Sequence, residues 1–236
     1  MRSYFVASIL VAILSSTPAD AVVGGDLIDV ALQRYTVAIR STMGLCTGVV
    51  LAQDIVLTAA HCTRDAQNVW VGGNQGWGDP SSSPVGLSPV TQIIQHPNYD
   101  PSQVLSPDLA LLKLAKPLPD RFLAASPGAR WPNEGDGVIT TGYGESVEND
   151  PSAGTVLRMV LLRVSHAYAN DLDLVSTHEE PAGSGRGDSG GPVFTYRGLN
   201  TLVGIIRGRR RGETIAVPIA PNYPWIKETM EKLGGR

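Results

Sequence analysis

The stretch Gly187-Asp188-Ser189-Gly190-Gly191-Pro192 is the most informative part of this 236-residue chain. It sets one serine among glycines, which lack a side chain and so let the backbone turn tightly and expose its own N–H groups. A serine hydroxyl is a weak nucleophile unless a histidine takes its proton and a carboxylate orients that histidine. The stretch therefore directs attention to the histidines and aspartates elsewhere in the chain.

Two upstream segments supply these groups. His61 lies in Thr58-Ala59-Ala60-His61-Cys62, and Asp108 opens the apolar run Asp108-Leu109-Ala110-Leu111-Leu112-Lys113-Leu114. Each feature has an ordinary alternative when it is taken singly. His61 could be a structural histidine, Asp108 could be the first residue of a strand, and the stretch around Ser189 could be an ordinary glycine loop. Together, and in this order along the chain, they predict nucleophilic catalysis by a serine, a histidine and an aspartate.

A second class of enzyme also places a serine between glycines. The G-x-S-x-G turn of α/β-hydrolases carries a nucleophilic serine, and its acid and histidine follow that serine in the chain. In this sequence every histidine precedes Ser189, namely His61, His96, His166 and His178. This order excludes an α/β-hydrolase.

The three segments resemble those of the trypsin- and chymotrypsin-like serine proteases, and the resemblance covers nearly all of residues 22–233. It implies an all-β fold of two packed antiparallel β-barrels of chymotrypsin type, followed by a C-terminal helix. The active site is then expected in the cleft between the barrels. We expect the first barrel over about residues 34–115, the second over about 130–222 and the helix over about 223–233.

The residue pattern itself agrees with an all-β fold. Short runs rich in β-branched residues alternate with clusters of Gly, Pro, Asn and Ser, which is typical of barrels built from short strands. The last segment instead has Trp225, Ile226, Met230 and Leu233 at helical spacing, which predicts a helix packed on the core. The expected strands span residues 47–52, 55–58, 69–72, 91–95, 109–114, 137–142, 155–164, 192–196, 201–206 and 214–219.

The resemblance assigns a role to each catalytic residue. Ser189 attacks the scissile carbonyl, His61 accepts its proton and returns it to the leaving amine, and Asp108 holds the imidazole tautomer. The backbone N–H groups of Gly187 and Ser189 are expected to form the oxyanion hole. No metal site is expected, because His178-Glu179-Glu180 lacks a second histidine at helical spacing, and no cofactor is expected.

The first residues resemble a secretory signal. Arg2 gives a basic start, residues 4–14 are almost uninterruptedly apolar, and Ala19-Asp20-Ala21 is typical of a signal-peptidase site. The alternative to a signal peptide is an N-terminal helix buried in the fold. A membrane span is not expected, because it needs ~20 residues and the apolar run is shorter. We therefore expect residues 1–21 to be removed and residues 22–236 to form a secreted or periplasmic peptidase domain.

The chain has two cysteines, Cys46 and Cys62. The resemblance implies a disulfide between them, beside the catalytic histidine, and a reduced pair is the alternative. Most animal relatives carry several more bridges, whereas here Gly185 stands where one cysteine of such a bridge is expected near the nucleophile. This sparse cysteine usage favours a bacterial member of the family.

A cut after Ala21 would free the amine of Val22, in the sequence Val22-Val23-Gly24-Gly25. In the family this first residue inserts its amine beside the aspartate that precedes the nucleophile, here Asp188. We therefore expect a Val22–Asp188 ion pair that forms without a separate zymogen cut. Arg186-Gly187-Asp188 also reads as an integrin-type adhesion motif, but the ion pair is the better use of Asp188.

Specificity is where the sequence departs from its family. Gly183 stands six residues before Ser189, at the pocket floor, where trypsins have an aspartate, so cleavage after Lys or Arg is not expected. The strand expected to pair with substrate reads Arg207-Gly208-Arg209, Arg210 and Arg211 follow it, and Arg186 lies three residues before Ser189.

Three interpretations of these arginines stay open. They form a solvated loop, or one or two of them line the pocket and bind an acidic side chain, or the pocket is small or apolar. The candidate substrate-binding residues are accordingly Gly183, Arg186, Arg207 and Arg209. Arg209 is bulky, and it is also expected to narrow the cleft.

The sequence thus predicts a serine endopeptidase that acts on proteins or peptides. The alternative is a weakly active or silent homologue that serves as a binding module, although such homologues usually lose a catalytic residue and this chain keeps all three. A net charge of -3 argues against a nucleic-acid partner. We expect a monomer with no membrane span once the signal is removed.

Overall fold

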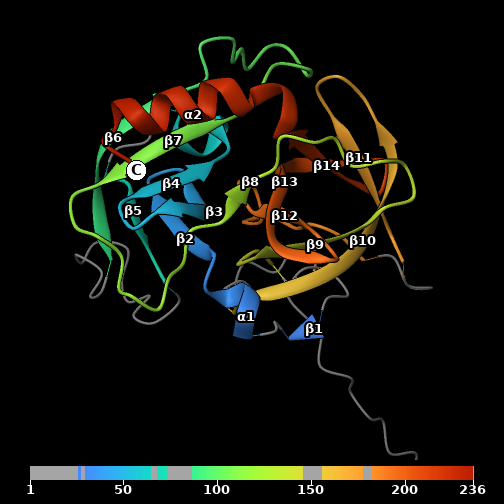
Figure 1. The fold of residues 1–236 in the computed structure, drawn as a ribbon, viewed down its shortest axis with the longest axis horizontal. Coiled ribbons are helices and arrows are strands. Elements are labelled where there is room, and N and C mark those ends of the chain that lie inside the picture. Colours follow the sequence, from blue (N-terminus) through green and yellow to red (C-terminus); the bar gives the residue numbers. More distant parts are fainter. Residues whose placement is uncertain are drawn as a thin grey trace, which may run out of the picture.

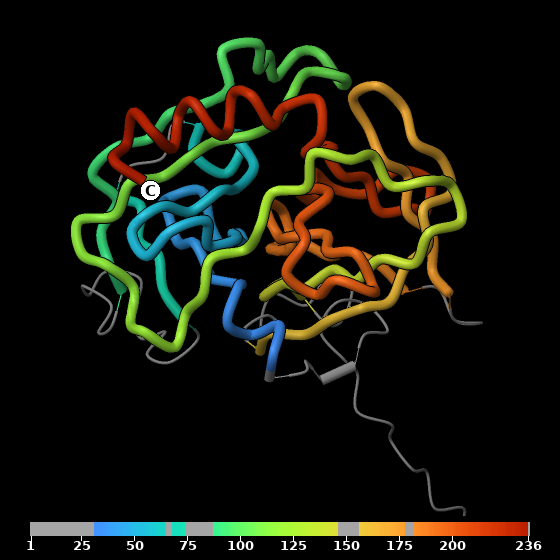
Figure 2. Tube along the Cα trace, in the orientation of Figure 1, coloured from blue at the N-terminus to red at the C-terminus, as the bar shows by residue number. Residues whose placement is uncertain are grey.

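Two β-barrels lie side by side in the computed structural model, and the C-terminal helix crosses from one to the other (Figures 1 and 2). The structure describes residues 26–27, 30–64, 68–73, 87–145, 156–177 and 182–235. The expected signal, Val22 and residues 178–181 lie outside the described residues. The two antiparallel barrels confirm the predicted all-β fold.

The first barrel is closed by six antiparallel strands, and its core is made by residues that alternate inward along each strand. Val37, Val50, Val56, Val71 and Leu112 meet there and are buried. The order around the barrel is β2 (Thr36–Ser41), β3 (Gly44–Ala52), β4 (Ile55–Thr58), β7 (Ala110–Leu114), β6 (Ser88–Gln95) and β5 (Trp70–Gly72).

The second barrel closes because β9 pairs with both β10 and β12. Its order is β9 (Gly137–Gly142), β10 (Arg158–Ala167), β11 (Leu172–Ser176), β14 (Glu213–Pro218), β13 (Gly198–Arg210) and β12 (Pro192–Thr195). Two short strands lie outside this ring: β1 (Asp26–Leu27) on β10, and β8 (Ser126–Pro127) on β13.

The helix α2 (Tyr223–Lys232) follows the second barrel in sequence but packs on the first, where it lies over β4 and β7 in Figure 1. Its Ile226 joins Ile55 and Leu57 in one buried cluster that also reaches Phe194 and Ile205 of the second barrel. The helix therefore contributes to a core that both barrels share. The other helices are short: α1 (Val30–Gln33), η1 (Ala60–Thr63) and η3 (Ala220–Asn222).

Several predicted strand bounds are wrong in detail. The strand expected over 201–206 runs from Gly198 to Arg210, so the arginine run lies mostly within β13 rather than beyond it. The strand expected over 155–164 runs to Ala167, and the one expected over 91–95 begins at Ser88. Within the described ranges, no helix is long and apolar enough to cross a membrane.

Candidate active site

His61 and Asp108 meet at the edge of the first barrel. Asp108 lies two residues before β7, and its carboxylate accepts two hydrogen bonds from His61. Oδ1 accepts from the backbone N–H of His61 at 2.8 Å, and Oδ2 lies 2.7 Å from Nδ1 of the His61 ring. A carboxylate only accepts, so Nδ1 carries the proton and Nε2 of a neutral ring keeps its lone pair.

The two partners differ in how far their side chains are exposed to solvent. The Asp108 side chain is 6% exposed, whereas that of His61 is 34% exposed. The buried carboxylate therefore fixes the ring from the protein side, while the ring remains open to a bound molecule. This is the arrangement that a general base requires.

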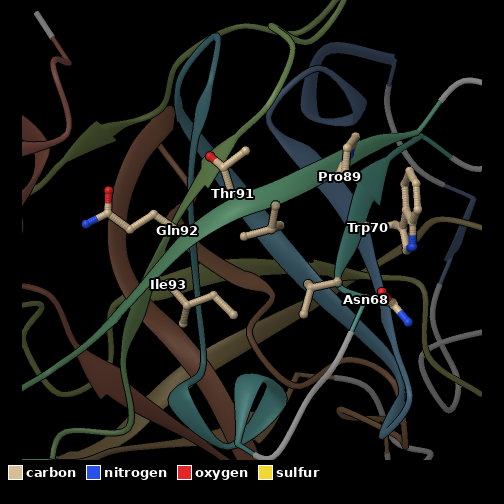
Figure 3. A pocket seen from close by; sticks show the side chains of 8 residues that line it. Asn68, Trp70, Pro89, Thr91, Gln92 and Ile93 are labelled. Atoms are coloured by element: carbon tan, nitrogen blue, oxygen red, sulfur yellow. The ribbon is translucent and has the colours of Figure 1, made fainter.

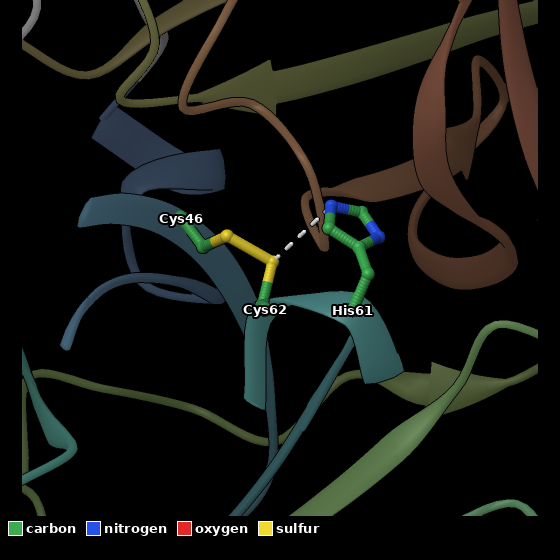
Figure 4. Close-up of side chains that lie close together, drawn as sticks. All are labelled: Cys46, His61 and Cys62. Carbon is green, nitrogen blue, oxygen red and sulfur yellow. Dashed lines mark hydrogen bonds between the residues drawn. A yellow bond between two sulfur atoms is a disulfide. The ribbon is translucent and has the colours of Figure 1, made fainter. Parts of the chain in front are cut away.

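A disulfide lies beside the His61 ring (Figure 4). Cys46 of β3 and Cys62 of η1 are bonded, which confirms the predicted pairing, and Cys62 Sγ is 3.7 Å from His61 Nε2. The bridge joins the histidine segment to the neighbouring strand. The same sulfur lies 3.6 Å from the carbonyl oxygen of Ser189.

The serine loop belongs to the second barrel but is held by the first. Thr47 of β3 donates its N–H to the carbonyl of Ser189 at 2.8 Å and its hydroxyl to the carbonyl of Gly187 at 2.8 Å. These two bonds seat Ser189 beside the histidine segment. Among the described residues no hydrogen bond links the Ser189 hydroxyl to His61, and such bonds often tighten only when substrate is bound.

Position 190 in the serine loop requires a glycine. Its φ of +83° is a conformation that side chains disfavour, and an added Cβ would meet the Thr58 hydroxyl and the Thr47 carbonyl. Thr58 begins the segment that carries His61. The glycine therefore lets the serine loop and the histidine segment come into direct contact.

Two N–H groups of the serine loop are available to a ligand. Within the described ranges the backbone N–H groups of Gly187 and Ser189 have no hydrogen-bond acceptor. The N–H groups of Asp188 and Gly190, in contrast, both donate to backbone carbonyls. Gly187 has a φ of +95°, which suits a bend that exposes its amide. The predicted oxyanion-hole donors are thus unpaired.

Asp188 lies on the inner side of this loop and is fully buried. Its Oδ1 accepts from Gly144 N–H at 2.8 Å and its Oδ2 from Gly185 N–H at 2.6 Å. Burial raises the pKa of Asp188 to about 7, although both hydrogen bonds act to lower it. A buried carboxylate cannot serve as an adhesion motif, and its predicted partner Val22 lies outside the described residues.

Sequence analysis missed two glycines that make room for this carboxylate. A Cβ at Gly142 or at Gly144 would collide with the carboxylate of Asp188. The Gly142-Tyr143-Gly144 spacing was the available signal, but it has meaning only once the position of Asp188 is known.

The arginines of β13 separate into two groups. Arg207 and Arg210 turn to two carboxylates that sequence analysis did not single out, Asp171 and Asp173 of the β11 region. Arg207 Nη1 lies 2.8 Å from Asp171 Oδ1, and its Nη2 donates to the carbonyl of Ser106. Arg207 thereby links the second barrel to the loop that carries Asp108, and its guanidinium is already paired.

The side chain of Arg209 lies near Gly183 instead. A Cβ added at Gly183 would lie 3.9 Å from Arg209 Nε and 3.0 Å from the Thr214 hydroxyl. The structure therefore brings Gly183 and Arg209 together. Arg186 is exposed, and its carbonyl accepts from Glu145 N–H at 2.7 Å.

A pocket of about 360 Å³ lies between β5 and β6 on the first barrel (Figure 3). It is lined by residues such as Asn68, Trp70, Gln92 and Ile93. None of the predicted catalytic or substrate-binding residues contributes to it. It is therefore separate from the candidate active site.

The sequence model of the Trypsin family matches residues 22–226 of the chain. The chain belongs to the trypsin family. This match spans both barrels and all three predicted catalytic residues, and trypsin-family relatives are serine-type endopeptidases, which are hydrolases.

Curated relatives cover most of this trypsin-family chain at low identity. Mouse Kallikrein 1-related peptidase b21 is 28% identical over 237 residues, which is 89% of this chain and 90% of the relative. Rat Granzyme B is 30% identical over 210 residues, 79% of this chain and 80% of the relative. These relatives are mammalian and lend no support to the predicted bacterial source.

Solved structures show the same trypsin-family fold. The structure of a scabies mite inactivated protease paralogue, S-I1, has a TM-score of 0.70 and 24% identity, covering 88% of this chain and 99% of that one. The structure of GrC has a TM-score of 0.72 and 22% identity over 89% of this chain and 99% of that one. Because the first of these proteins is an inactivated protease paralogue, the shared fold alone does not show activity.

Proposed function

We propose that this trypsin-family chain is an active serine endopeptidase that works through His61, Asp108 and Ser189. The observation that carries the proposal is the pair of hydrogen bonds that His61 donates to the Asp108 carboxylate, which fix both the backbone and the ring of the histidine. A homologue that had lost catalysis would have no need to hold the ring in this tautomer.

The proposed reaction follows from this geometry. His61 Nε2 takes the proton of the Ser189 hydroxyl as that oxygen attacks the peptide carbonyl, and His61 then gives the proton to the leaving amine. The unpaired N–H groups of Gly187 and Ser189 stabilise the negative charge on the tetrahedral intermediate. Water releases the acyl group from Ser189 by the same steps.

Activation is proposed to need a free amine at Val22. The carboxylate of Asp188 is buried with no cation beside it among the described residues, and burial raises its pKa. An ammonium group there would remove this penalty and fix the serine loop. The signal-peptidase cut after Ala21 is proposed to produce that amine.

The remaining features are proposed on sequence grounds. The chain is secreted, acts as a monomer on proteins or peptides, and has no nucleic-acid partner. A bacterial or periplasmic setting rests on the sparse cysteine usage alone.

An organophosphate that labels active serine hydrolases tests the proposal directly. The purified chain beginning at Val22 should gain one covalent adduct, located at Ser189 by peptide mass spectrometry. Ser189→Ala should gain none, and Ser102→Ala, at an exposed serine, should be labelled like the unaltered chain. A folded chain that takes no label would instead favour the silent homologue that acts as a binding module.

A further inference from the structure

We infer that Arg209 determines the specificity of the proposed peptidase and selects substrates with an acidic side chain next to the scissile bond. This inference rests on the proposed function. It deepens that function by naming the substrate class.

The serine loop and the strand that carries Arg209 run beside each other. Gly190 N–H donates to the carbonyl of Ile206 at 2.7 Å, and the Ser184 hydroxyl donates to the carbonyl of Gly208 at 3.3 Å. Segment 184–190 therefore lies along the stretch of β13 from Ile206 to Gly208. A peptide held at Ser189 has its adjacent side chain next to this strand.

Cross-strand pairing sets the direction of Arg209. In the β13–β14 hairpin Arg209 pairs with Thr214, and side chains of paired residues lie on the same face of a sheet. The Thr214 hydroxyl accepts from Ser184 N–H at 2.9 Å, so this face is turned toward the serine loop. Arg209 shares it, as its approach to Gly183 also shows.

The next residue along the strand faces the other way, because successive side chains alternate. Arg210 pairs with Glu213 across the hairpin and lies 2.9 Å from Asp173 Oδ1. The alternation therefore assigns Arg210 to the structural carboxylates and Arg209 to the serine loop.

Arg209 has no carboxylate partner within the described ranges. The one hydrogen bond of its side chain there is a 3.4 Å contact from Nη2 to the carbonyl of Gly212. Gly183 has no side chain that would block the guanidinium or neutralise it. A carboxylate from a substrate would supply the missing partner through charge-assisted hydrogen bonds in a fork geometry suited to arginine.

Matched peptides test the inference on the chain beginning at Val22. They differ only at the residue before the scissile bond, which is Glu, Gln, Asp, Asn, Leu or Lys. We expect kcat/KM for Glu and Asp to exceed that for Gln and Asn by roughly 10- to 100-fold, the range for a hydrogen bond to a charged group. Arg209→Gln should remove this ratio, and Arg209→Glu should favour Lys instead.

Arg211→Gln is the matched control, because Arg211 lies exposed at the tip of the same hairpin. It removes the same charge and should keep the preference. Equal cleavage of the Glu and Gln peptides, or a preference retained in Arg209→Gln, would overturn the inference.

Organophosphate labelling separates the two possible failures. Labelling of Ser189 together with indifference to acidic residues leaves the peptidase intact and removes only the role of Arg209. Absence of both labelling and cleavage by a folded chain removes the peptidase, and the inference with it.

Discussion

Arg207 of β13 and Asp171, the residue before β11, form an ion pair with 2.8 Å between Nη1 and Oδ1 and only 1% of the Asp171 side chain exposed. Desolvation raises the pKa of Asp171, and the neighbouring Arg207 and Arg210 oppose that shift. Within the described ranges the second oxygen of Asp171 accepts no hydrogen bond. Arg210 Nη1 approaches that oxygen only to 3.6 Å, so among the described residues Arg207 is the one cation within hydrogen-bond distance of Asp171.

Asp171→Asn should destabilise the protein strongly, because it leaves the Arg207 guanidinium, 15% exposed, without a counter-charge. Breaking a buried pair in this way costs about 3–5 kcal/mol. Urea unfolding followed by tryptophan fluorescence measures the change. Asp173→Asn is the control, because its partner Arg210 is 41% exposed and solvent screens the pair, so we expect a loss of about 1 kcal/mol or less. Equal losses in the two variants would contradict the proposed difference.

The disulfide between Cys46 and Cys62 should stabilise the first barrel. It closes a loop of 16 residues in sequence separation, for which the loop-entropy treatment gives about 3 kcal/mol. Cys46→Ala combined with Cys62→Ala should lower the unfolding free energy by this amount. Reductant should lower the stability of the unaltered chain and leave that of the double variant unchanged. A double variant as stable as the oxidised parent would show that the bridge contributes nothing.

Ser189→Ala should abolish hydrolysis and keep the fold. The substitution removes one oxygen that has no hydrogen-bond partner among the described residues, and the two Thr47 bonds to the loop use carbonyls that remain. Loss of a triad member costs several orders of magnitude in kcat. Activity on a labelled protein substrate and the near-ultraviolet circular dichroism spectrum are the two measurements. A variant with parental kcat would require another nucleophile.

The strand β11, with Asp173 in it and Asp171 just before it, is a part of the fold that the sequence did not predict. Aspartate is depleted in strands, and none of the predicted strands covers the segment that the structure shows as Leu172–Ser176. The charges of the two aspartates are matched by Arg207 and Arg210, which stand more than 30 residues later in the chain. β13 continues to Arg210, which pairs with Glu213 of β14, beyond the predicted end of the strand at residue 206.

The candidate catalytic segments stand out in the sequence because their proposed chemistry is local to each motif. Ser189 among glycines, and His61 beside Cys62, carry their meaning in neighbouring residues, and the family resemblance supplies their order. The proposed role of Arg209 is different, because it depends on the face of the hairpin from which the side chain projects. That face is set by the register of Arg209 with Thr214, which only the structure gives.

Asp188 should make stability depend on pH in the full chain, where the nitrogen of Val22 is part of a peptide bond. Its pKa is raised from 3.8 to about 7, mainly by burial. The unfolded chain therefore releases this proton first, and the folded state loses stability as pH rises from about 4 to 7. A shift of about three pKa units corresponds to a loss of about 4 kcal/mol at most.

A free Val22 amine should remove this loss of stability with rising pH. Its ammonium group stabilises the carboxylate, so the chain beginning at Val22 should not lose stability over the same pH range. Urea unfolding of both forms at pH 4.5 and pH 7.5 measures the difference in stability. Asp188→Asn in the full chain is the control. Its amide cannot ionise, so this variant should lack the contribution of Asp188 to the pH dependence. If the full chain and the chain beginning at Val22 lose stability equally as pH rises, the amine does not reach Asp188, and the proposed activation by signal removal is wrong.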